Sequence, residues 1–321
     1  MKRRCVILDD YQNVALKLAD WSPVSGDLDI KVFNAHLGPQ ERVVEALRDA
    51  EIICLMRERT RFPREAIEAL PNLKLLITTG MYNASVDLAA ALARGVVICG
   101  TRGVGSPTAD LAMGLILDLA RSISFEDARM KRGEPWQTTI GIDLAGQTLG
   151  LLGLGKLGSR VAKLAQAFDM KVIAWSQNLT AERCREIGVE HASKEDLFAR
   201  ADFISIHLVL SPRTRGLVAG ADLARMKPTA FLVNTSRGPI VDQAALIDAL
   251  RNRKIAGAGI DVYDTEPLPT DHPLRKLPNA VLTPHLGYVT EINYRRFYAD
   301  IVEDIRAWLD GKPVRLVTAN K

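Results

Sequence analysis

The sequence predicts an α/β protein with two doubly wound parallel-sheet domains. Its 321 residues exceed the length at which one hydrophobic core keeps growing, so two domains are expected. Short apolar runs alternate with segments of helical periodicity from the start of the chain, which is the β-α-β rhythm of a parallel sheet. A second series of the same kind begins at Thr148, so the pattern indicates two complete α/β domains.

The first series contains five predicted strands. Strands are expected at residues 5–8, 30–33, 52–55, 73–77 and 96–99, and helices at 40–49 and 63–70. Residues 108–130 keep a helical period throughout, and Pro107 suits the first turn of a helix. We therefore expect one long helix that leaves the first domain.

The second series also contains five predicted strands. They are expected at residues 148–152, 171–175, 203–206, 230–233 and 258–261. An amphipathic helix at about residues 291–309 closes the chain. Because this segment has no strands of its own, we expect it to pack back on the first domain.

The composition is that of an ordinary globular protein. With 47% hydrophobic and 25% charged residues, it excludes disordered, collagen-like and disulfide-scaffold classes. The net charge of +4 is spread along the chain, so no nucleic-acid partner is expected. The four cysteines lack metal-ligand spacing, and the apolar run after Arg4 is too short for a signal peptide. No run approaches the ~18 apolar residues of a membrane span. We therefore expect a cytoplasmic protein with no metal site and no membrane partner.

A glycine-rich turn stands between a predicted strand and a predicted helix. Its cofactor candidates are Gly153, Gly155, Lys156, Leu157 and Gly158. In a dinucleotide fold, such glycines allow a tight turn, close approach of the backbone to a pyrophosphate, and packing of helix on strand. The alternative is an ordinary glycine turn, which the flanking strand and helix disfavour.

The end of the next strand lacks the acid that usually selects NAD. Ser176, Gln177 and Asn178 stand where an acid would hold the adenosine ribose. Because a carboxylate would repel a 2′-phosphate and neutral donors do not, we expect NADP(H) to be weakly preferred over NAD(H). The cationic partner would come from Arg183 or Arg185, or be missing, and the alternative is that Ser176 binds the ribose of NAD.

The chain resembles the D-isomer-specific 2-hydroxyacid dehydrogenase family from about residue 5 to its end. Five ordered motifs carry the resemblance: residues 149–158, 226–228 (MKP), 234–238 (NTSRG), 259–263 (GIDVY) with the following Glu266-Pro267, and 282–287 (LTPHLG). The resemblance implies a Rossmann cofactor domain, residues 105–285, inserted in a flavodoxin-like substrate domain formed by residues 1–104 and 286–321.

The family resemblance also implies three catalytic residues. Arg237 follows a predicted strand, and its guanidinium would clamp a substrate carboxylate and polarise the neighbouring carbonyl. His285 would deliver or remove the hydroxyl proton, with Glu266 on its other ring nitrogen. Without the resemblance, a solvated arginine and a structural histidine would be the ordinary interpretations.

Further positions match the family's cofactor and substrate contacts. His207 and Thr214 match the loop over the cofactor phosphates, although Val209 replaces the usual proline, and Asp261 matches the acid that holds the nicotinamide carboxamide. For Asp261 the alternative is a solvated strand-end carboxylate. The implied cofactor set is completed by Thr108, Thr235 and Gly287.

The first domain supplies the expected substrate contacts. Residues 79–87 match a glycine-rich loop whose amides hold the substrate carboxylate, and here Met81 and Tyr82 are the candidates. Tyr82 replaces a glycine of the family pattern and Ala84 an acid. Arg57 matches the arginine that faces the substrate and is a candidate for a second anionic group, a solvated surface arginine being the alternative.

The sequence is thus interpreted as an oxidoreductase that moves a hydride between NAD(P)H and C2 of a small 2-oxo or D-2-hydroxy acid. Glyoxylate or hydroxypyruvate reductase is the nearest specific function, and a homodimer built around residues 108–130 is expected. The alternatives are a dinucleotide-sensing binding protein like the C-terminal binding corepressors and a phosphoglycerate dehydrogenase-like enzyme, which fits less well because no regulatory domain is expected before Lys321. A formate dehydrogenase is disfavoured because that branch typically replaces Glu266 by glutamine.

Overall fold

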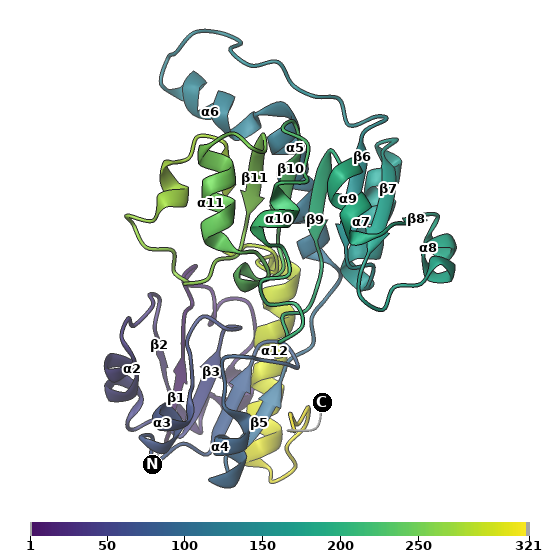
Figure 1. Ribbon diagram of the computed structural model, residues 1–321. Coiled ribbons are helices and arrows are strands. Elements are labelled where there is room, and N and C mark those ends of the chain that lie inside the picture. The colour runs from purple at the N-terminus through teal and green to yellow at the C-terminus, as the bar shows by residue number, and fades with distance from the viewer. Residues whose placement is uncertain (1, 319–321) are drawn as a thin grey trace. The chain divides into compact units, whose positions relative to one another are not determined.

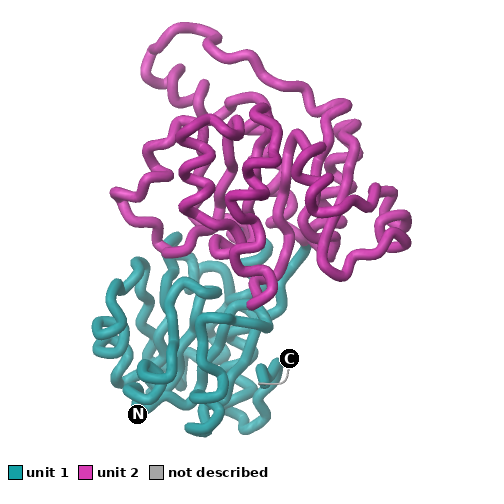
Figure 2. The backbone as a smooth tube through the Cα atoms, in the orientation of Figure 1, with its two compact units in different colours: residues 1–105, 290–321 teal, residues 106–289 magenta. Residues whose placement is uncertain are grey.

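The computed structural model describes residues 2–318, which divide into two compact units (Figure 1; Figure 2). Unit 1 takes its described residues from Met1–Gly105 and Thr290–Lys321, and unit 2 is Ser106–Val289. Each unit contains one parallel β-sheet with helices, which confirms the predicted fold class.

Unit 1 has a five-stranded sheet in the order β2-β1-β3-β4-β5. Its strands are β1 (Arg3–Ile7), β2 (Leu28–Val32), β3 (Ile52–Leu55), β4 (Leu75–Thr78) and β5 (Val97–Gly100). Every residue of β3 and β4 is buried, as expected of parallel strands covered on both faces. The order is that of flavodoxin-like folds, and all neighbouring strands are parallel.

The helices of unit 1 include the last helix of the chain. They are α1 (Ser22–Ser25), α2 (Gln40–Leu47), α3 (Arg64–Glu68), α4 (Leu88–Ala93) and α12 (Glu291–Leu309). Tyr294, Tyr298, Ile301 and Ile305 lie three or four positions apart on α12 and are buried, so one stripe of the helix faces the domain core. Contacts with α1 and β4 confirm that this helix packs on the first domain.

Unit 2 has a seven-stranded sheet in the order β12-β11-β10-β9-β6-β7-β8, parallel throughout. Its strands are β6 (Thr148–Leu152), β7 (Lys171–Trp175), β8 (Glu190–His191), β9 (Phe203–Ile206), β10 (Phe231–Asn234), β11 (Gly257–Ile260) and β12 (Ala280–Leu282). β8 and β12 were not predicted from the sequence, because two or three residues are too few to show a period.

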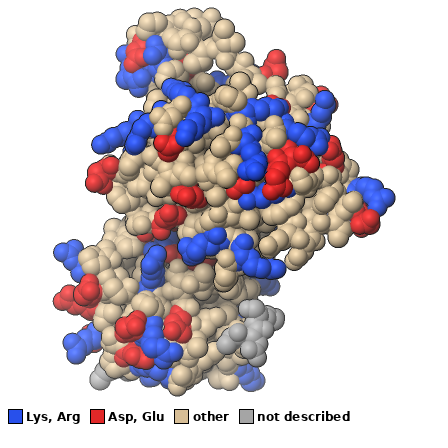
Figure 3. Space-filling model, in the orientation of Figure 1, with Lys and Arg blue, Asp and Glu red and all other residues tan. Residues whose placement is uncertain are grey.

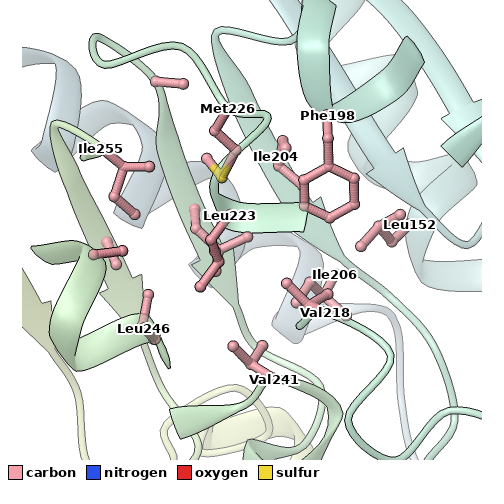
Figure 4. Close-up of a cluster of buried hydrophobic side chains, with 14 of the residues drawn as sticks. Leu152, Phe198, Ile204, Ile206, Val218, Leu223, Met226, Val241, Leu246 and Ile255 are labelled. Carbon is pink, nitrogen blue, oxygen red and sulfur yellow. The ribbon is translucent and has the colours of Figure 1, made fainter. Parts of the chain in front are cut away.

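Helices cover both faces of the second sheet. They are α5 (Pro107–Arg121), α6 (Ile123–Lys131), α7 (Lys156–Ala167), α8 (Ala181–Ile187), α9 (Lys194–Arg200), α10 (Gly220–Leu223) and α11 (Gln243–Arg251), with short 3₁₀ helices at Gly238–Ile240 and Pro273–Lys276. Successive strand residues point to opposite faces, so Phe203 packs in the cluster under α5 and α7 while Ile204 packs under α9 to α11 (Figure 4).

The prediction of a single helix at residues 108–130 is wrong. α5 and α6 meet at Ser122, whose backbone is left-handed with φ 52° and ψ 38°. A left-handed residue cannot continue a right-handed helix, so the chain changes direction there. Periodicity did not reveal the break, because both flanking segments are themselves helical.

On the face drawn in Figure 3, lysine and arginine are interspersed with aspartate and glutamate. Among residues 2–318, no helix combines the length and apolar character needed to cross a bilayer.

Candidate active site

The candidate site of unit 2 lies at the carboxyl edge of its sheet. The strand order reverses between β6 and β9, and ligands of open α/β sheets bind outside the carboxyl ends of the strands at such a point. The candidates that follow strand ends are Gly153 after β6, Ser176 after β7, His207 after β9, Thr235 after β10 and Asp261 after β11. The topology therefore brings residues far apart in the sequence to one edge.

Two glycines of the loop after β6 are required by close contacts. Gly153 has φ +101°, and a Cβ there would lie 2.6 Å from the His207 carbonyl oxygen. A Cβ on Gly158 would lie 2.1 Å from the carbonyl oxygen of Gly153. Gly155, the N-cap of α7, instead faces open space, because a Cβ there would have no heavy atom within 4 Å. The loop thus leaves room at a helix N-terminus, where a pyrophosphate fits.

Two buried polar atoms near this edge lack partners among the described residues. They are Nδ1 of His207 and Oγ1 of Thr235. The other ring nitrogen of His207 lies 2.9 Å from Ser205 Oγ. Burial lowers the pKa of His207 to about 4, so its imidazole is neutral near pH 7. Because an unsatisfied buried polar atom costs about 1–3 kcal/mol, these atoms fit a site that a polar ligand completes.

The loop after β9 uses its threonine internally. Thr214 Oγ1 donates to the Val209 carbonyl oxygen at 2.7 Å and accepts from the Ser211 amide at 2.8 Å. Thr214 therefore closes the loop on itself, and Val209 at its tip is exposed. Lys156, the first residue of α7, is also exposed, while Leu157 is partly buried.

The end of β7 carries neutral side chains. Ser176 is partly buried, and Gln177 and Asn178 are exposed. The two arginines considered as cationic partners are engaged on α8: Arg183 pairs with Glu186 and Arg185 with Glu182, each at 2.7 Å. Exposed pairs of this kind are weak, so they hold the arginines only loosely.

Asp261 anchors the segment that carries His285. Its fully buried carboxylate accepts hydrogen bonds from Thr283 Oγ1 at 2.6 Å, from the Leu286 amide at 2.7 Å and from the Gly287 amide at 2.9 Å. Burial raises the pKa of Asp261, and these hydrogen bonds oppose the rise. The alternative of a solvated carboxylate is wrong, because the residue is inaccessible to solvent.

The anchored segment has a second attachment and an unusual backbone. Thr108 Oγ1, at the start of α5, donates to the Gly287 carbonyl oxygen at 2.9 Å. His285 itself donates its amide to the Asp261 carbonyl oxygen at 2.9 Å and has φ 53°. A left-handed histidine is strained by about 1–3 kcal/mol and persists because its surroundings hold it.

His285 and Glu266 form a close pair. Nδ1 of His285 lies 2.6 Å from Oε2 of Glu266, and the side chains are only 16% and 28% exposed. Tyr288 packs edge-on against the imidazole, with ring centroids 5.4 Å apart. Because Glu266 occupies Nδ1, the ring nitrogen available for proton exchange with a bound molecule is Nε2.

Arg237 follows β10 in an extended conformation. Its carbonyl oxygen accepts from Asn234 Nδ2 at 3.0 Å, and its Nη1 donates to the Ser236 carbonyl oxygen at 2.7 Å. The next residue, Gly238, packs on the Tyr263 peptide, where a Cβ would lie 2.2 Å from the carbonyl carbon. Tyr263 has no role that the sequence predicts, although it lies where the Arg237, Glu266 and His285 segments meet.

The substrate candidates of unit 1 follow β3 and β4. Arg57 has φ 52°, donates its amide to Thr79 Oγ1 at 2.8 Å, and donates from Nη1 to the Thr79 carbonyl oxygen at 3.0 Å. A Cβ on Gly80 would lie 1.9 Å from that Nη1, so the guanidinium occupies space that only glycine leaves. Met81 and Tyr82, next along the loop, are exposed.

Comparison with known proteins connects this geometry to one family. The model described as "D-isomer specific 2-hydroxyacid dehydrogenase, NAD binding domain" matches residues 113–287. The glyoxylate reductase of Aeropyrum pernix is 35% identical over 300 residues, covering 90% of this chain and 89% of that protein. The D-3-phosphoglycerate dehydrogenase of Mycobacterium tuberculosis is 37% identical over 284 residues, covering 86% of this chain and 52% of its own. The chain therefore spans about half the length of such phosphoglycerate dehydrogenases.

The fold is also shared with solved structures. A phosphoglycerate oxidoreductase from Vibrio cholerae superposes with a TM-score of 0.91 at 34% identity, covering 97% of this chain and 100% of that one. The similarity spans both units.

Two alanine substitutions should distinguish Gly158, which close packing requires, from Gly155, which faces the proposed ligand. Gly158→Ala should lower the free energy of unfolding by about 1–3 kcal/mol, because its methyl group meets the Gly153 carbonyl. Gly155→Ala should leave thermal unfolding of the ligand-free protein nearly unchanged and weaken dinucleotide binding, measured by NADH and NADPH fluorescence titration. Equal losses of stability in both variants would contradict this division.

Proposed function

The chain belongs to the D-isomer-specific 2-hydroxyacid dehydrogenase family, and on that basis we propose that it is an oxidoreductase acting on small 2-oxo and D-2-hydroxy acids. It would transfer a hydride between NAD(P)H and C2 of the acid. The observation that carries the proposal is the His285–Glu266 pair at 2.6 Å, in the domain that matches the family's NAD-binding model.

The residues of unit 2 have separate proposed tasks. The loop Gly153–Gly158 and the N-terminus of α7 bind the pyrophosphate through backbone amides, while His207 and Thr235 offer unpartnered polar atoms. When bound, the reduced nicotinamide supplies the hydride that reaches C2. Asp261 keeps the loop of His285 in place. It would accept a hydrogen bond from the nicotinamide carboxamide only if this edge opened, because its carboxylate is fully buried. The domain at 105–285 is thus the proposed cofactor domain, and the remainder the substrate domain.

Three side chains are proposed to bind the substrate carboxylate and to transfer the proton. Arg237 binds the substrate carboxylate and polarises the C2 carbonyl with its planar fork. His285 donates its Nε2 proton to the carbonyl oxygen as that oxygen becomes a hydroxyl. Glu266 orients the ring through Nδ1 and stabilises the imidazolium before the proton leaves.

Glyoxylate or hydroxypyruvate is the proposed substrate. The near full-length match to a glyoxylate reductase supports this choice. A phosphoglycerate dehydrogenase-like activity is the second candidate. Relatives of that name have a sequence identity to this chain similar to that of the glyoxylate reductase, and Arg57 offers a guanidinium for a second anionic group of the substrate. Met81 and Tyr82 are the proposed contacts to the remainder of the substrate.

Turnover assays test the proposal directly. The protein should reduce glyoxylate or hydroxypyruvate faster than 3-phosphohydroxypyruvate, and His285→Ala should lower kcat about 10²–10⁴-fold with dinucleotide affinity preserved. His191→Ala, at an exposed position of β8, is the matched control. If the wild type reduces none of the 2-oxo acids yet binds the dinucleotide, the corepressor-like sensing function is favoured instead.

Removing the charge of Glu266 should shift the pH profile. In Glu266→Gln the imidazolium of His285 loses its anionic partner, so the limb of the kcat profile that this pair controls moves to lower pH. Steady-state rates from pH 5 to 10 measure this limb. An unmoved limb would remove Glu266 from this role.

We further propose that NADPH is accepted and weakly preferred. Ser176, Gln177 and Asn178 carry no negative charge to repel a 2′-phosphate. Arg183 and Arg185 each have a glutamate beside them, whose charge offsets that of the guanidinium. The preference is therefore expected to be small, because neutral donors stabilise a phosphate dianion less than cations do.

Ser176→Asp should shift selectivity toward NADH. The carboxylate repels the 2′-phosphate, and the shift should shrink as salt rises. The ratio of kcat/KM values for the two cofactors measures it, with Ser176→Ala as the uncharged control. A wild type that favours NADH tenfold or more, or an aspartate variant with an unaltered ratio, would refute the proposal.

The proposed partner is a second copy of the chain. The segment from α6 onward exposes large apolar side chains: Ile123 (54%), Phe125 (44%), Met130 (58%), Trp136 (74%) and Ile140 (100%). So many exposed apolar side chains within eighteen positions are typical of an interaction surface, and the family resemblance makes a second copy of the chain the expected partner.

A cytoplasmic location is part of the same proposal, supported by four buried free thiols and testable by cell fractionation.

Two charged substitutions test the dimer. Trp136→Glu combined with Ile140→Glu should convert a dimer into a monomer in sedimentation velocity. Phe168→Glu, on another partly exposed apolar residue of unit 2, should leave the dimer intact. A wild type that sediments as a monomer at micromolar concentration would overturn the proposal.

A further inference from the structure

Tyr263 is a buried side chain shortly after β11, and it contacts three segments of the candidate site. It is 7% exposed. Its amide, its carbonyl group and its hydroxyl each meet a different segment, and each of those segments carries one of the proposed catalytic residues. The steps proposed for those catalytic residues make no direct use of Tyr263.

The amide of Tyr263 holds Glu266. It donates to Oε1 of that carboxylate at 2.9 Å, while Oε2 lies 2.6 Å from His285 Nδ1. The carboxylate is therefore held at both oxygens, which sets its rotation. Hydrogen bonds to a charged acceptor are roughly twice as strong as neutral ones, so this contact is a firm one.

The hydroxyl of Tyr263 ties together two strand ends. It lies within donating distance of the Ile260 carbonyl oxygen, at 2.9 Å, and of the Thr283 carbonyl oxygen, at 3.0 Å. Thr283 precedes His285 by two residues. Burial raises the pKa of Tyr263 well above its ordinary value, so the hydroxyl keeps its proton and remains a donor across the working pH range.

The carbonyl side of Tyr263 supports the Arg237 turn. A Cβ on Gly238 would lie 2.2 Å from the Tyr263 carbonyl carbon and 2.6 Å from the Asp264 nitrogen. The residue after Arg237 thus rests directly on this peptide. A shift of the Tyr263 peptide would be transmitted to the Arg237 turn.

We propose that Tyr263 is the positioning residue of the site, aligning Glu266 with His285 and supporting the turn of Arg237. It acts through these residues and does not touch the substrate, and the inference rests on the proposed function. The contribution of the hydroxyl can be tested separately from the others. A phenylalanine would keep the ring packing and the peptide contacts but would lose the hydrogen bond to the Thr283 carbonyl oxygen. Asp261 holds the same loop through the Thr283 side chain and the amides of Leu286 and Gly287, so the loop should shift slightly and not unfold.

The shift should be visible in the titration of His285. Two carboxylates act on the imidazole: Glu266 at 2.6 Å, and Asp261, whose charge also interacts with that of His285. If the alignment with Glu266 loosens, the imidazolium form of His285 is stabilised less relative to the neutral ring.

Tyr263→Phe tests this inference with two readouts. The midpoint of the pH-dependent change in the His285 ring resonances, assigned by comparison with His285→Ala, should move to lower pH than in the wild type, without any ligand. The kcat for the 2-oxo acid should fall about fivefold while the dinucleotide Kd stays within about twofold, the size expected for one lost hydrogen bond. Tyr298→Phe is the control, because it removes a buried hydroxyl in unit 1 that bonds to none of the described residues.

An unchanged His285 titration in Tyr263→Phe, or an equal change in Tyr298→Phe, would overturn the inference. If the variant fails to fold, a measurement on the wild type still tests the inference. The ¹H–¹⁵N resonance of the Tyr263 amide should shift with pH at the same midpoint as the His285 ring. A Tyr263 amide resonance that does not shift would also overturn the inference. If the wild type reduces no 2-oxo acid, the proposed function fails, but these titrations still decide the role of Tyr263.

Discussion

A buried carboxylate at the end of β11 holds the part of unit 2 on which the candidate chemistry depends. Asp261 is inaccessible to solvent and accepts three hydrogen bonds from the segment that contains His285. A buried carboxylate without partners would protonate, and a loop without such an acceptor would leave its amides unsatisfied. The carboxylate and the loop therefore stabilise each other. Together they hold the His285 backbone in its strained left-handed conformation.

The same edge of the sheet combines close packing with open space. Gly153 and Gly158 let β6, α7 and the loop of His207 approach within contact distances that no side chain permits, while Gly155 leaves the N-terminus of α7 accessible. A site for an anion is thereby formed by backbone groups, whose positions depend on packing and not on flexible side chains. The neutral His207 beside it adds a polar group without a competing charge.

The differences between expectation and structure have local causes. The helix expected at 108–130 is interrupted because one residue, Ser122, is left-handed, and hydrophobic periodicity does not report a single backbone angle. Thr214 lies in the loop that the family resemblance assigns to the cofactor, where its hydroxyl closes the loop on itself, and its contact with the cofactor stays a prediction. Tyr263 lies within a family motif but has no role that the sequence predicts, because its contacts with Thr283 and Gly238 join residues that are distant in the chain.

Several features of this protein follow from the amino-acid sequence alone: the fold class, the positions of most strands and the glycine loop. His285 and Glu266 became a candidate pair through the family resemblance. Local periodicity, turn chemistry and ordered motifs are readable from neighbouring residues, and the absence of an acid after β7 is a matter of identity at Ser176. Other features became known only from the folded chain: Asp261 is buried, and Tyr263 joins three segments. Those facts depend on burial and on distances between residues far apart in the chain, which arise only when parallel strands bring their carboxyl ends to one edge.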